Sequence, residues 1–179
     1  MASPGGAGRN KTLGQKEFGE LEIVIPQNVK EQKKISEILL TWDKAIELKE
    51  KLIERKKEQK KGLMQMLLTG EYRLKGFEEK WKEFQLGNIT EITTGNKDTK
   101  DKIENGKYPF FVRSETVEKI NSYSFDGEAI LIPGDGNIGQ IYHYINGKFD
   151  FHQRVYKISN FDKGCSGKFV YYYLPLVLH

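Results

Sequence analysis

The sequence predicts an α+β protein: a long helix that can form a coiled coil, followed by a β-rich domain with small helices. Three observations carry this prediction. Residues 29–61 contain neither proline nor glycine, strand-like segments begin after Trp81, and short turn signals separate those segments. A chain of 179 residues, 30% of them charged, has enough length and wetted surface for one domain plus an extended element.

The N-terminal segment, residues 1–27, is expected to be a flexible start that leads into a short strand. Its first eight residues are rich in glycine and alanine and lack the apolar centre of a signal peptide, so no export is implied. Residues 21–25 (LEIVI) have the composition of a strand, and Pro26 suits a strand end.

The spacer helix is expected over residues 28–70. Asn28 suits the N-cap position, and Glu31 stands where a capping box needs its acidic residue. Thr69-Gly70 is a typical helix end with glycine just outside. About 40 helical residues would extend roughly 60 Å.

Apolar residues along this helix recur in alternating steps of four and three, which is typical of a coiled-coil seam. Lysines occupy the middle of the seam, at positions 49, 56 and 60, and a second apolar stripe flanks it. Such a helix needs a partner, and the chain has no second heptad segment, so self-association is the simplest source. The predicted seam consists of Ile35, Leu39, Trp42, Ile46, Ile53, Leu63 and Leu67.

A linker over residues 71–80 leads to the β-rich domain at 81–179. We expect strands within 84–94, 108–112, 129–133, 141–145 and 149–158. Asn146-Gly147 favours a type I′ hairpin turn. Residues 169–174 are predicted to form a short helix that stops before Pro175, although their aromatic side chains also permit a strand.

Charge is distributed unevenly along the chain. Residues 1–80 hold 17 Lys and Arg against 13 Asp and Glu, whereas residues 81–179 hold 12 of each. A lysine-rich helix is more often a solvated face than a phosphate-binding surface. The single cysteine, Cys165, excludes an intrachain disulfide or a cysteine-built zinc site and favours the cytoplasm. The longest apolar segment is too short to span a membrane.

Catalytic and cofactor sites have little support. The glycine cluster at 134–139 precedes a predicted hairpin rather than a helix, so a tight loop is favoured over a phosphate-binding loop. Three histidines show no metal-site spacing. The acidic residues Asp126, Glu128 and Asp135 suit turns better than a nuclease centre. We therefore predict no cofactor, no metal and no catalytic residue.

Side chains suited to reading base edges or phosphates recur at the ends of the predicted strands. Arginine and lysine suit guanine, and amide side chains suit adenine. Each residue alone is more often ordinary surface, but together, in a β-rich domain beside a basic helix, they favour a nucleic-acid interface. The candidates are Asn96, Lys97, Arg113, Ser114, Asn137, His152, Gln153 and Arg154.

In this order, several motifs resemble the specificity subunits of type I restriction-modification enzymes. Pro26 with residues 31–46 resembles the start of that family's spacer helix, and residues 61–70 (KGLMQMLLTG) resemble its end. Residues 81–87 (WKEFQLG) resemble the entry to a target recognition domain. Three further segments resemble the interior of that domain: residues 108–114 (YPFFVRS), 134–136 (GDG) and 151–156 (FHQRVY).

The resemblance implies a non-catalytic subunit that reads bipartite double-stranded DNA, while partner methyltransferase and restriction subunits carry out the chemistry. The family pairs two recognition domains through two antiparallel helices, whereas this chain has one of each. Residues 13–25 resemble the closing segment of a recognition domain. We therefore expect an antiparallel homodimer, with possible exchange of that segment between chains. The alternative is a coiled-coil adaptor with a protein-binding β domain, which the neutral charge of residues 81–179 favours.

Overall fold

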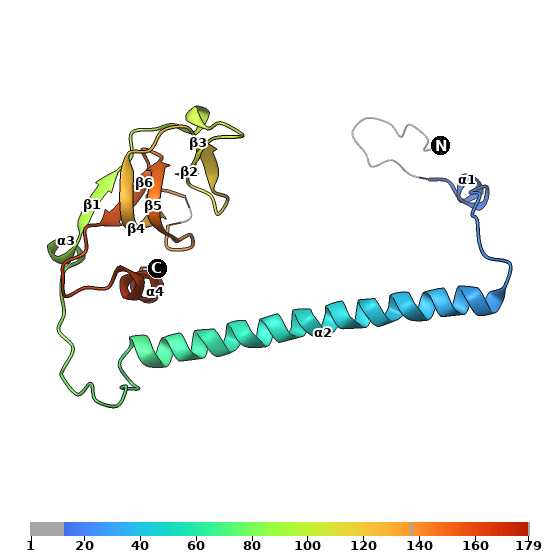
Figure 1. The fold of residues 1–179 in the computed structure, drawn as a ribbon, viewed down its shortest axis with the longest axis horizontal. Coiled ribbons are helices and arrows are strands. Elements are labelled where there is room, and N and C mark those ends of the chain that lie inside the picture. Colours follow the sequence, from blue (N-terminus) through green and yellow to red (C-terminus); the bar gives the residue numbers. More distant parts are fainter. Residues whose placement is uncertain (1–12, 137, 179) are drawn as a thin grey trace. The chain divides into compact units, whose positions relative to one another are not determined.

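The structure, a computed structural model, describes residues 13–136 and 138–178. The chain forms two compact units, Met1–Gln59 and Lys60–His179. The predicted α+β class is confirmed, and within the described ranges no helix is long and apolar enough to cross a bilayer. In chain order (Figure 1), the elements are α1 (Gln15–Gly19), α2 (Val29–Leu68), α3 (Leu86–Ile89), β1 (Glu91–Thr94), η1 (Thr99–Asp101), β2 (Tyr108–Phe111), β3 (Glu118–Ile120), β4 (Phe125–Pro133), β5 (His143–Phe151), β6 (Val155–Ser159) and α4 (Gly167–Val177).

Helix α2 runs for 40 residues without interruption, as its periodicity predicts. The Asn28 side chain accepts a hydrogen bond from Lys30 N at 2.9 Å, so the predicted N-cap is present. The described bonds do not include the predicted return bond from Glu31; instead Gln32 Nε2 donates to Pro26 O at 2.6 Å. Gly70, with φ +77°, follows the helix end, where glycine is the least strained residue.

Helix α2 is amphipathic, and most of its apolar side chains are exposed. Lys44 lies 2.8 Å from Glu47, and Lys57 lies 2.7 Å from Glu54, so the charged face is laced by ion pairs one turn apart. On the predicted seam, Trp42 is 67% exposed. The other seam residues from Ile35 to Leu63 are exposed as well, and Leu67 is half-buried. An apolar stripe of this length is expected to bury its surface against a partner.

The segment before α2 differs from the prediction. A short helix, α1, covers Gln15–Gly19, and residues 21–25 form no strand. A strand requires a hydrogen-bonded neighbour, and residues 13–59 contain no strand that could supply one. The side chains of Ile23 and Val24 are 76% and 103% exposed. The sequence therefore has strand composition here without a partner strand in its own unit.

The second unit contains one six-stranded sheet with the order β1-β6-β4-β5-β2-β3. Neighbouring strands are antiparallel except for β2 and β5, which run parallel. The predicted strand at 84–94 is shorter than expected, because α3 takes up its first half and only β1 is extended. β3 was not predicted.

Strand β5 contradicts the predicted hairpin at Asn146-Gly147. It runs straight through these residues, and Gly147 pairs with Gly127 of β4. Both glycines have positive φ, +144° for Gly147 and +153° for Gly127. Glycine adopts such angles without steric strain, so the strands continue through this point and the chain does not turn back. Local turn preference is overridden because β4 offers a pairing partner on both sides of the two residues.

The sheet is strongly curled. Phe149 of β5 pairs with Phe125 at the start of β4, whereas Val155 of β6 pairs with Pro133 at its end. Only three residues connect β5 to β6, so these two ends meet only if the sheet curls on itself. A parallel bridge between Lys97 and His152 joins the chain after β1 to the end of β5. Inside the curl lie Phe111, Ala129, Leu131, Phe149, Phe151 and Val155.

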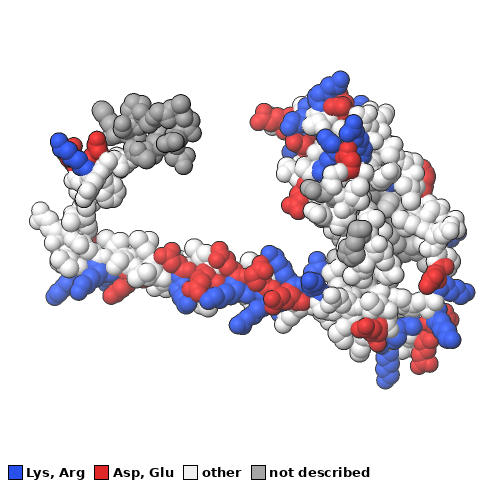
Figure 2. All heavy atoms as spheres, turned by 180° about the vertical axis from the view of Figure 1, so that it is seen from behind, with Lys and Arg blue, Asp and Glu red and all other residues white. Residues whose placement is uncertain are grey.

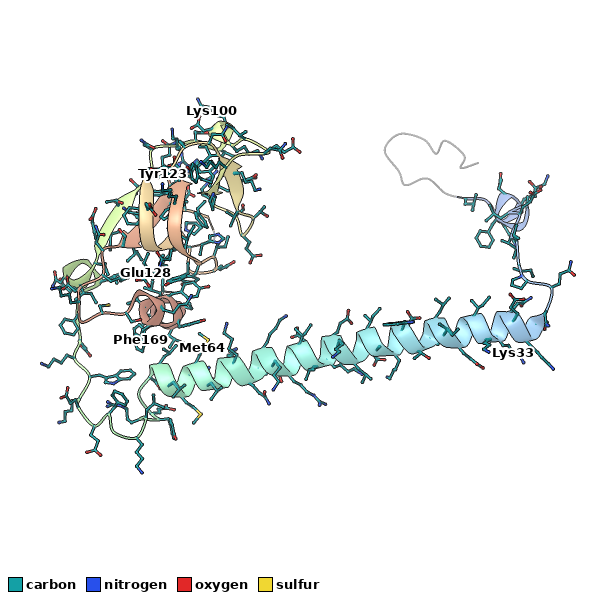
Figure 3. The ribbon with its side chains drawn as sticks, in the orientation of Figure 1. Lys33, Met64, Lys100, Tyr123, Glu128 and Phe169 are labelled. Atoms are coloured by element: carbon teal, nitrogen blue, oxygen red, sulfur yellow. The ribbon has the colours of Figure 1, made fainter. Side chains whose placement is uncertain are left out.

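Helix α4 covers the opposite face of the sheet, where Ile130, Ile132 and Ile158 pack against its Val170 and Leu174. Alternate residues of β4 therefore serve two cores. Helix α4 continues through Pro175 rather than stopping before it, which corrects the predicted end. Glu128 of β4, labelled in Figure 3, has its carboxylate next to Gly167 at the start of α4. It accepts a 2.6 Å hydrogen bond from Tyr144, which raises the pKa of Tyr144 to about 12.

Candidate nucleic-acid interface

The predicted site residues come from segments that the curled sheet brings to one end. Backbone bonds join these segments: Gln153 N donates to Lys97 O at 2.9 Å, and His152 N donates to Phe111 O at 2.9 Å. Gly134 N donates to Arg154 O at 2.8 Å. The ends of β1, β2 and β4 therefore all meet the β5–β6 connection. This convergence places Lys97, Arg113, Gln153 and Arg154 together, although up to 57 positions separate them in the sequence.

Two of these residues, Arg113 and Arg154, share one carboxylate. Arg154 Nη1 lies 2.9 Å from Asp135 Oδ2, and Arg113 Nη1 lies 3.2 Å from both carboxylate oxygens. The side chains of Arg113 and Arg154 remain 46% and 61% exposed, so both guanidinium groups face water while anchored. The Arg154 and Arg113 contacts lower the pKa of Asp135 below its usual value, which keeps it charged. We call these three residues the arginine–aspartate cluster.

His152 is buried beneath this surface and supports the backbone of the site. Its side chain is buried, with only 3% of the residue exposed, and Nδ1 accepts a hydrogen bond from Arg154 N at 3.0 Å. Burial, aided by the positive charge of Arg113, lowers the pKa of His152 below its usual 6.5. A neutral imidazole is the form that accepts at Nδ1. The ring thus fixes the backbone that carries Arg154.

Other predicted residues make contacts of their own. Gln153 Nε2 donates to Asp98 Oδ2 at 3.3 Å, and Asp98 also caps η1 through a capping box. Asn96 is exposed next to Lys97, which is half-buried. Ser114 O lies 3.1 Å from His143 Nε2. Asn137 lies outside the described residues.

Asp135 belongs to the candidate interface although it was not among the predicted site residues. It was expected to serve in a turn, like Asp126 and Glu128, but the structure separates the three. Asp126 approaches Lys148 at 4.0 Å, Glu128 binds Tyr144, and Asp135 holds the arginines. Its flanking glycines were the only local signal. Among residues 13–136 and 138–178, no group of three or more acidic, His or Cys residues could hold a metal ion.

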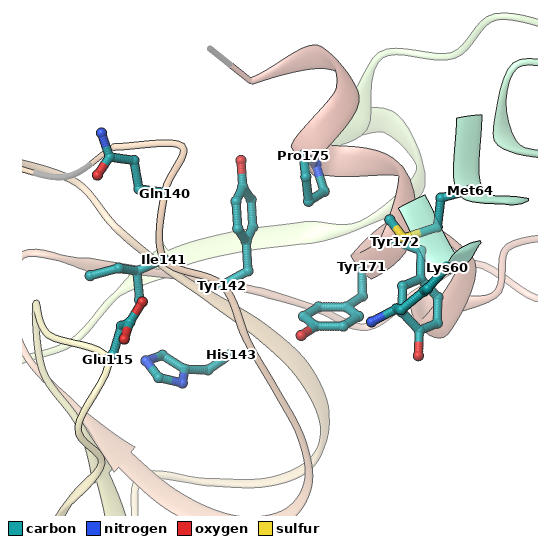
Figure 4. Close-up of a pocket in the computed structure, with 10 residues that line it drawn as sticks. All are labelled: Lys60, Met64, Glu115, Gln140, Ile141, Tyr142, His143, Tyr171, Tyr172 and Pro175. Carbon is teal, nitrogen blue, oxygen red and sulfur yellow. The ribbon is translucent and has the colours of Figure 1, made fainter. Parts of the chain in front are cut away.

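A pocket of about 420 Å³ opens elsewhere in the second unit (Figure 4). Tyrosines dominate its wall, with Tyr171 and Tyr172 from α4 and Tyr142 from the chain before β5. Lys60 Nζ lies 5.4 Å from the Tyr172 ring centre. Among residues 13–136 and 138–178, none of the predicted base-reading residues lines this pocket.

Charged side chains of both signs are interspersed over the visible surface (Figure 2), in keeping with the neutral balance of residues 81–179. The candidate interface is therefore defined by its strand-end side chains rather than by a broad basic field. The anchored arginines are thus presented at one end of a curled sheet, where they are exposed to a ligand surface.

The chain belongs to the family described as "Type I restriction modification DNA specificity domain", which it matches over residues 1–57 and 78–179. It is 41% identical over 79 residues to the type I restriction enzyme EcoDI specificity subunit of Escherichia coli; the match covers 44% of this chain and 17% of that protein.

One solved structure is similar in fold, and a second gives a weaker match. The S subunit of a type I restriction-modification system from M. genitalium has a TM-score of 0.70 at 19% identity, covering 93% of this chain and 47% of that one. The HsdS subunit from Thermoanaerobacter tengcongensis has a TM-score of 0.48 at 15% identity, covering 82% and 40%. This chain thus matches less than half the length of each of these relatives.

Proposed function

We propose that this chain is a DNA sequence-recognition component of a type I restriction-modification complex and reads one half of a bipartite site. The observation that carries this proposal is the arrangement of Arg113 and Arg154, which are exposed and anchored side by side at one end of a sheet in a DNA specificity domain. Guanidinium groups held in this way suit bidentate contacts with guanine in the major groove.

Within the proposed interface, neighbouring residues have complementary roles. Gln153 and Asn96 offer amide groups suited to adenine, and Lys97 and Ser114 suit phosphate oxygens. His152 acts from below, because it is buried and holds the backbone of Arg154. We assign the chain no chemistry of its own: methylation and cleavage would belong to partner methyltransferase and restriction subunits that it positions on DNA.

Helix α2 is proposed to serve as spacer and dimer seam. Its uncovered apolar stripe supports association with a second copy, and antiparallel pairing would place two recognition domains at opposite ends. Residues 21–25 are exposed and have strand composition but no partner strand within the described residues, which supports exchange of this segment between chains. The two separate family matches, on either side of residues 58–77, are consistent with a chain that joins the end of one domain to the start of another.

Selection from a pool of random DNA duplexes tests the proposal, with the full chain alone and together with its methyltransferase subunit. We expect enrichment of one half-site repeated as an interrupted palindrome, because two identical domains would be related by a twofold axis. Binding should weaken steeply as salt rises, in proportion to the phosphates contacted. Recovery of no motif in either setting would refute the proposal.

The alternative is a coiled-coil adaptor whose β domain binds protein, favoured by the equal numbers of acidic and basic residues in 81–179. Such a domain has little long-range attraction for DNA. The two functions predict different salt responses, because a protein–protein contact of mixed charge loses far less affinity than a contact with several phosphates.

A further inference from the structure

Asp135 occupies an unusual place for an acidic residue at a proposed DNA surface. A carboxylate repels phosphates, yet this one stands at the centre of the two most exposed arginines of the interface. Its neighbours in the sequence do not explain the arrangement, since Arg113 and Arg154 lie 22 and 19 positions away. Among the described hydrogen bonds, this carboxylate therefore connects the chain after β2 with the β5–β6 connection through side chains.

The loop that carries Asp135 is held in place on both sides. Before it, Pro133 is fully buried and Gly134 N bonds to Arg154 O at 2.8 Å. A side chain at Gly134 would collide with the Tyr156 ring, 2.9 Å from the position of its first carbon. After it, Gly136 has φ +72°, a conformation that glycine adopts without strain. The position of the carboxylate is thus set by the sheet rather than by a mobile loop.

The anchoring leaves the arginines usable. In the described bonds, each guanidinium meets Asp135 through Nη1 alone, so its Nη2 and Nε hydrogens remain available. A bidentate contact with the O6 and N7 atoms of guanine needs two such donors in a fixed plane. Anchoring at one nitrogen lowers the entropy that each side chain loses when it binds.

We propose that Asp135 is the positioning residue of the interface, which orients Arg113 and Arg154 toward base edges and keeps phosphates away from them. This inference rests on the proposed DNA-recognition function. It gives the carboxylate two separable effects, because its position sets specificity and its charge limits non-specific affinity. A surface ion pair without this role would alter neither base preference nor the ratio of specific to non-specific binding.

Two variants separate position from charge. Asp135→Asn keeps the shape and removes the charge, whereas Asp135→Glu keeps the charge and moves the carboxylate by one carbon. We expect Asp135→Glu to lose about tenfold in the ratio of specific to non-specific affinity through weaker binding of the target, which is the discrimination provided by one bidentate arginine–guanine pair. Asp135→Asn should lower the same ratio by several-fold through stronger non-specific binding. Only Asp135→Asn should gain non-specific affinity, by several-fold at low salt.

Glu118→Gln is the matched control. Glu118 of β3 forms an ion pair with Lys102 at 3.1 Å, and its substitution changes the net charge by the same amount as Asp135→Asn. Affinities are measured for the full chain, with its methyltransferase subunit, on the selected duplex and on a scrambled one, and thermal unfolding confirms that each variant folds. The inference would be overturned if Asp135→Asn selected the same DNA motif with the same ratio of specific to non-specific affinity, or if it behaved like Glu118→Gln. Either result would leave the proposed function intact. A wild-type chain that selects no motif would instead refute the proposed function, and the inference with it.

Discussion

At the scale of single residues, the interface depends on where a few side chains are anchored. Arg113 and Arg154 were predictable as candidates from residue type and from their place beside predicted strands. Their common attachment to Asp135 was not, because it depends on how the sheet curls and brings three distant segments together. The burial of His152 was hidden for the same reason: nothing local distinguishes a buried histidine from an exposed one beside Gln153.

Replacing Arg113 or Arg154 by alanine should relax base preference at particular positions of the target. Each lost base contact is expected to cost about 1–3 kcal/mol of discrimination, because the unpaired base edge then loses its specific donors. Selection and sequencing of bound duplexes measure this directly. Alanine at Arg55, Lys56 or Lys57 of α2 should instead weaken binding uniformly or disturb a partner, and uniform loss from both sets would contradict the site assignment.

His152 should make stability depend on pH. Its pKa is below 6.5 in the folded protein, so between that folded pKa and about 6.5 the unfolded chain binds more protons. The contribution of neutral His152 to the free energy of unfolding should therefore be fully present above about pH 6.5. It should decrease as pH falls toward the folded pKa, by about 1.4 kcal/mol in total for each unit of difference between the two pKa values. Urea unfolding near neutral pH and again below the usual histidine pKa measures the decrease.

The His152→Asn variant is the control for this pH dependence. Its amide oxygen can still accept the Arg154 backbone N–H, but it does not titrate. The additional loss of stability on mild acidification should be absent from this variant. Equal losses in the variant and the wild type would assign the effect to other groups.

At the scale of elements, helix α2 and strand β5 show why prediction succeeded in one place and failed in another. The bounds of α2 follow from signals within the segment itself: a capping asparagine, an unbroken apolar period and a terminal glycine. The conformation of β5 depends instead on its neighbour, because β4 pairs with it on both sides of Gly147 and overrides a strong local preference for a turn. Strand assignments depend on distant partners in a way that helix assignments do not.

Gly147→Ala tests this interpretation of β5. Its φ of +144° is unfavourable for any residue with a side chain, so alanine should destabilise the folded protein by about 1–3 kcal/mol. Gly164→Ala is the matched control, because a methyl group there meets nothing within 4 Å and its φ is ordinary. Chemical denaturation of both variants measures the difference. Equal stabilities would imply that residues 146–147 are not held in a continuous strand.

At the scale of the whole molecule, the chain has recognisable parts whose use, in the proposed function, depends on association. The helix and the sheet could both be predicted, but the structure of residues 13–25 could not: α1 was not expected, and residues 21–25 have strand composition yet form no strand. Strand composition alone does not decide such a segment, because a strand also needs a hydrogen-bonded neighbour.

Self-association through α2 should be sensitive to one charge on the seam. We expect Ile46→Glu to reduce the protein to monomers at micromolar concentration, since Ile46 is an exposed apolar residue at the predicted contact. Light scattering coupled to size exclusion measures the mass. Leu48→Glu is the matched control, because Leu48 is equally apolar but lies on the opposite side of the helix, about 200° around its axis. A wild-type chain that is already monomeric would contradict the proposed seam.

The three-residue connection between β5 and β6 restricts how a protein of this design could acquire a new DNA target. Residues 152–154 bond to the chain after β1, to β2 and to β4, so an inserted residue would break the closure of the curled sheet. Divergence at that point must proceed by exchanging side chains at constant length. Beyond the bridged Lys97, the longer segments that lead to β2 and from β2 to β3 can vary by insertion, so evolutionary change of length and of chemistry should be divided between different loops of the same interface.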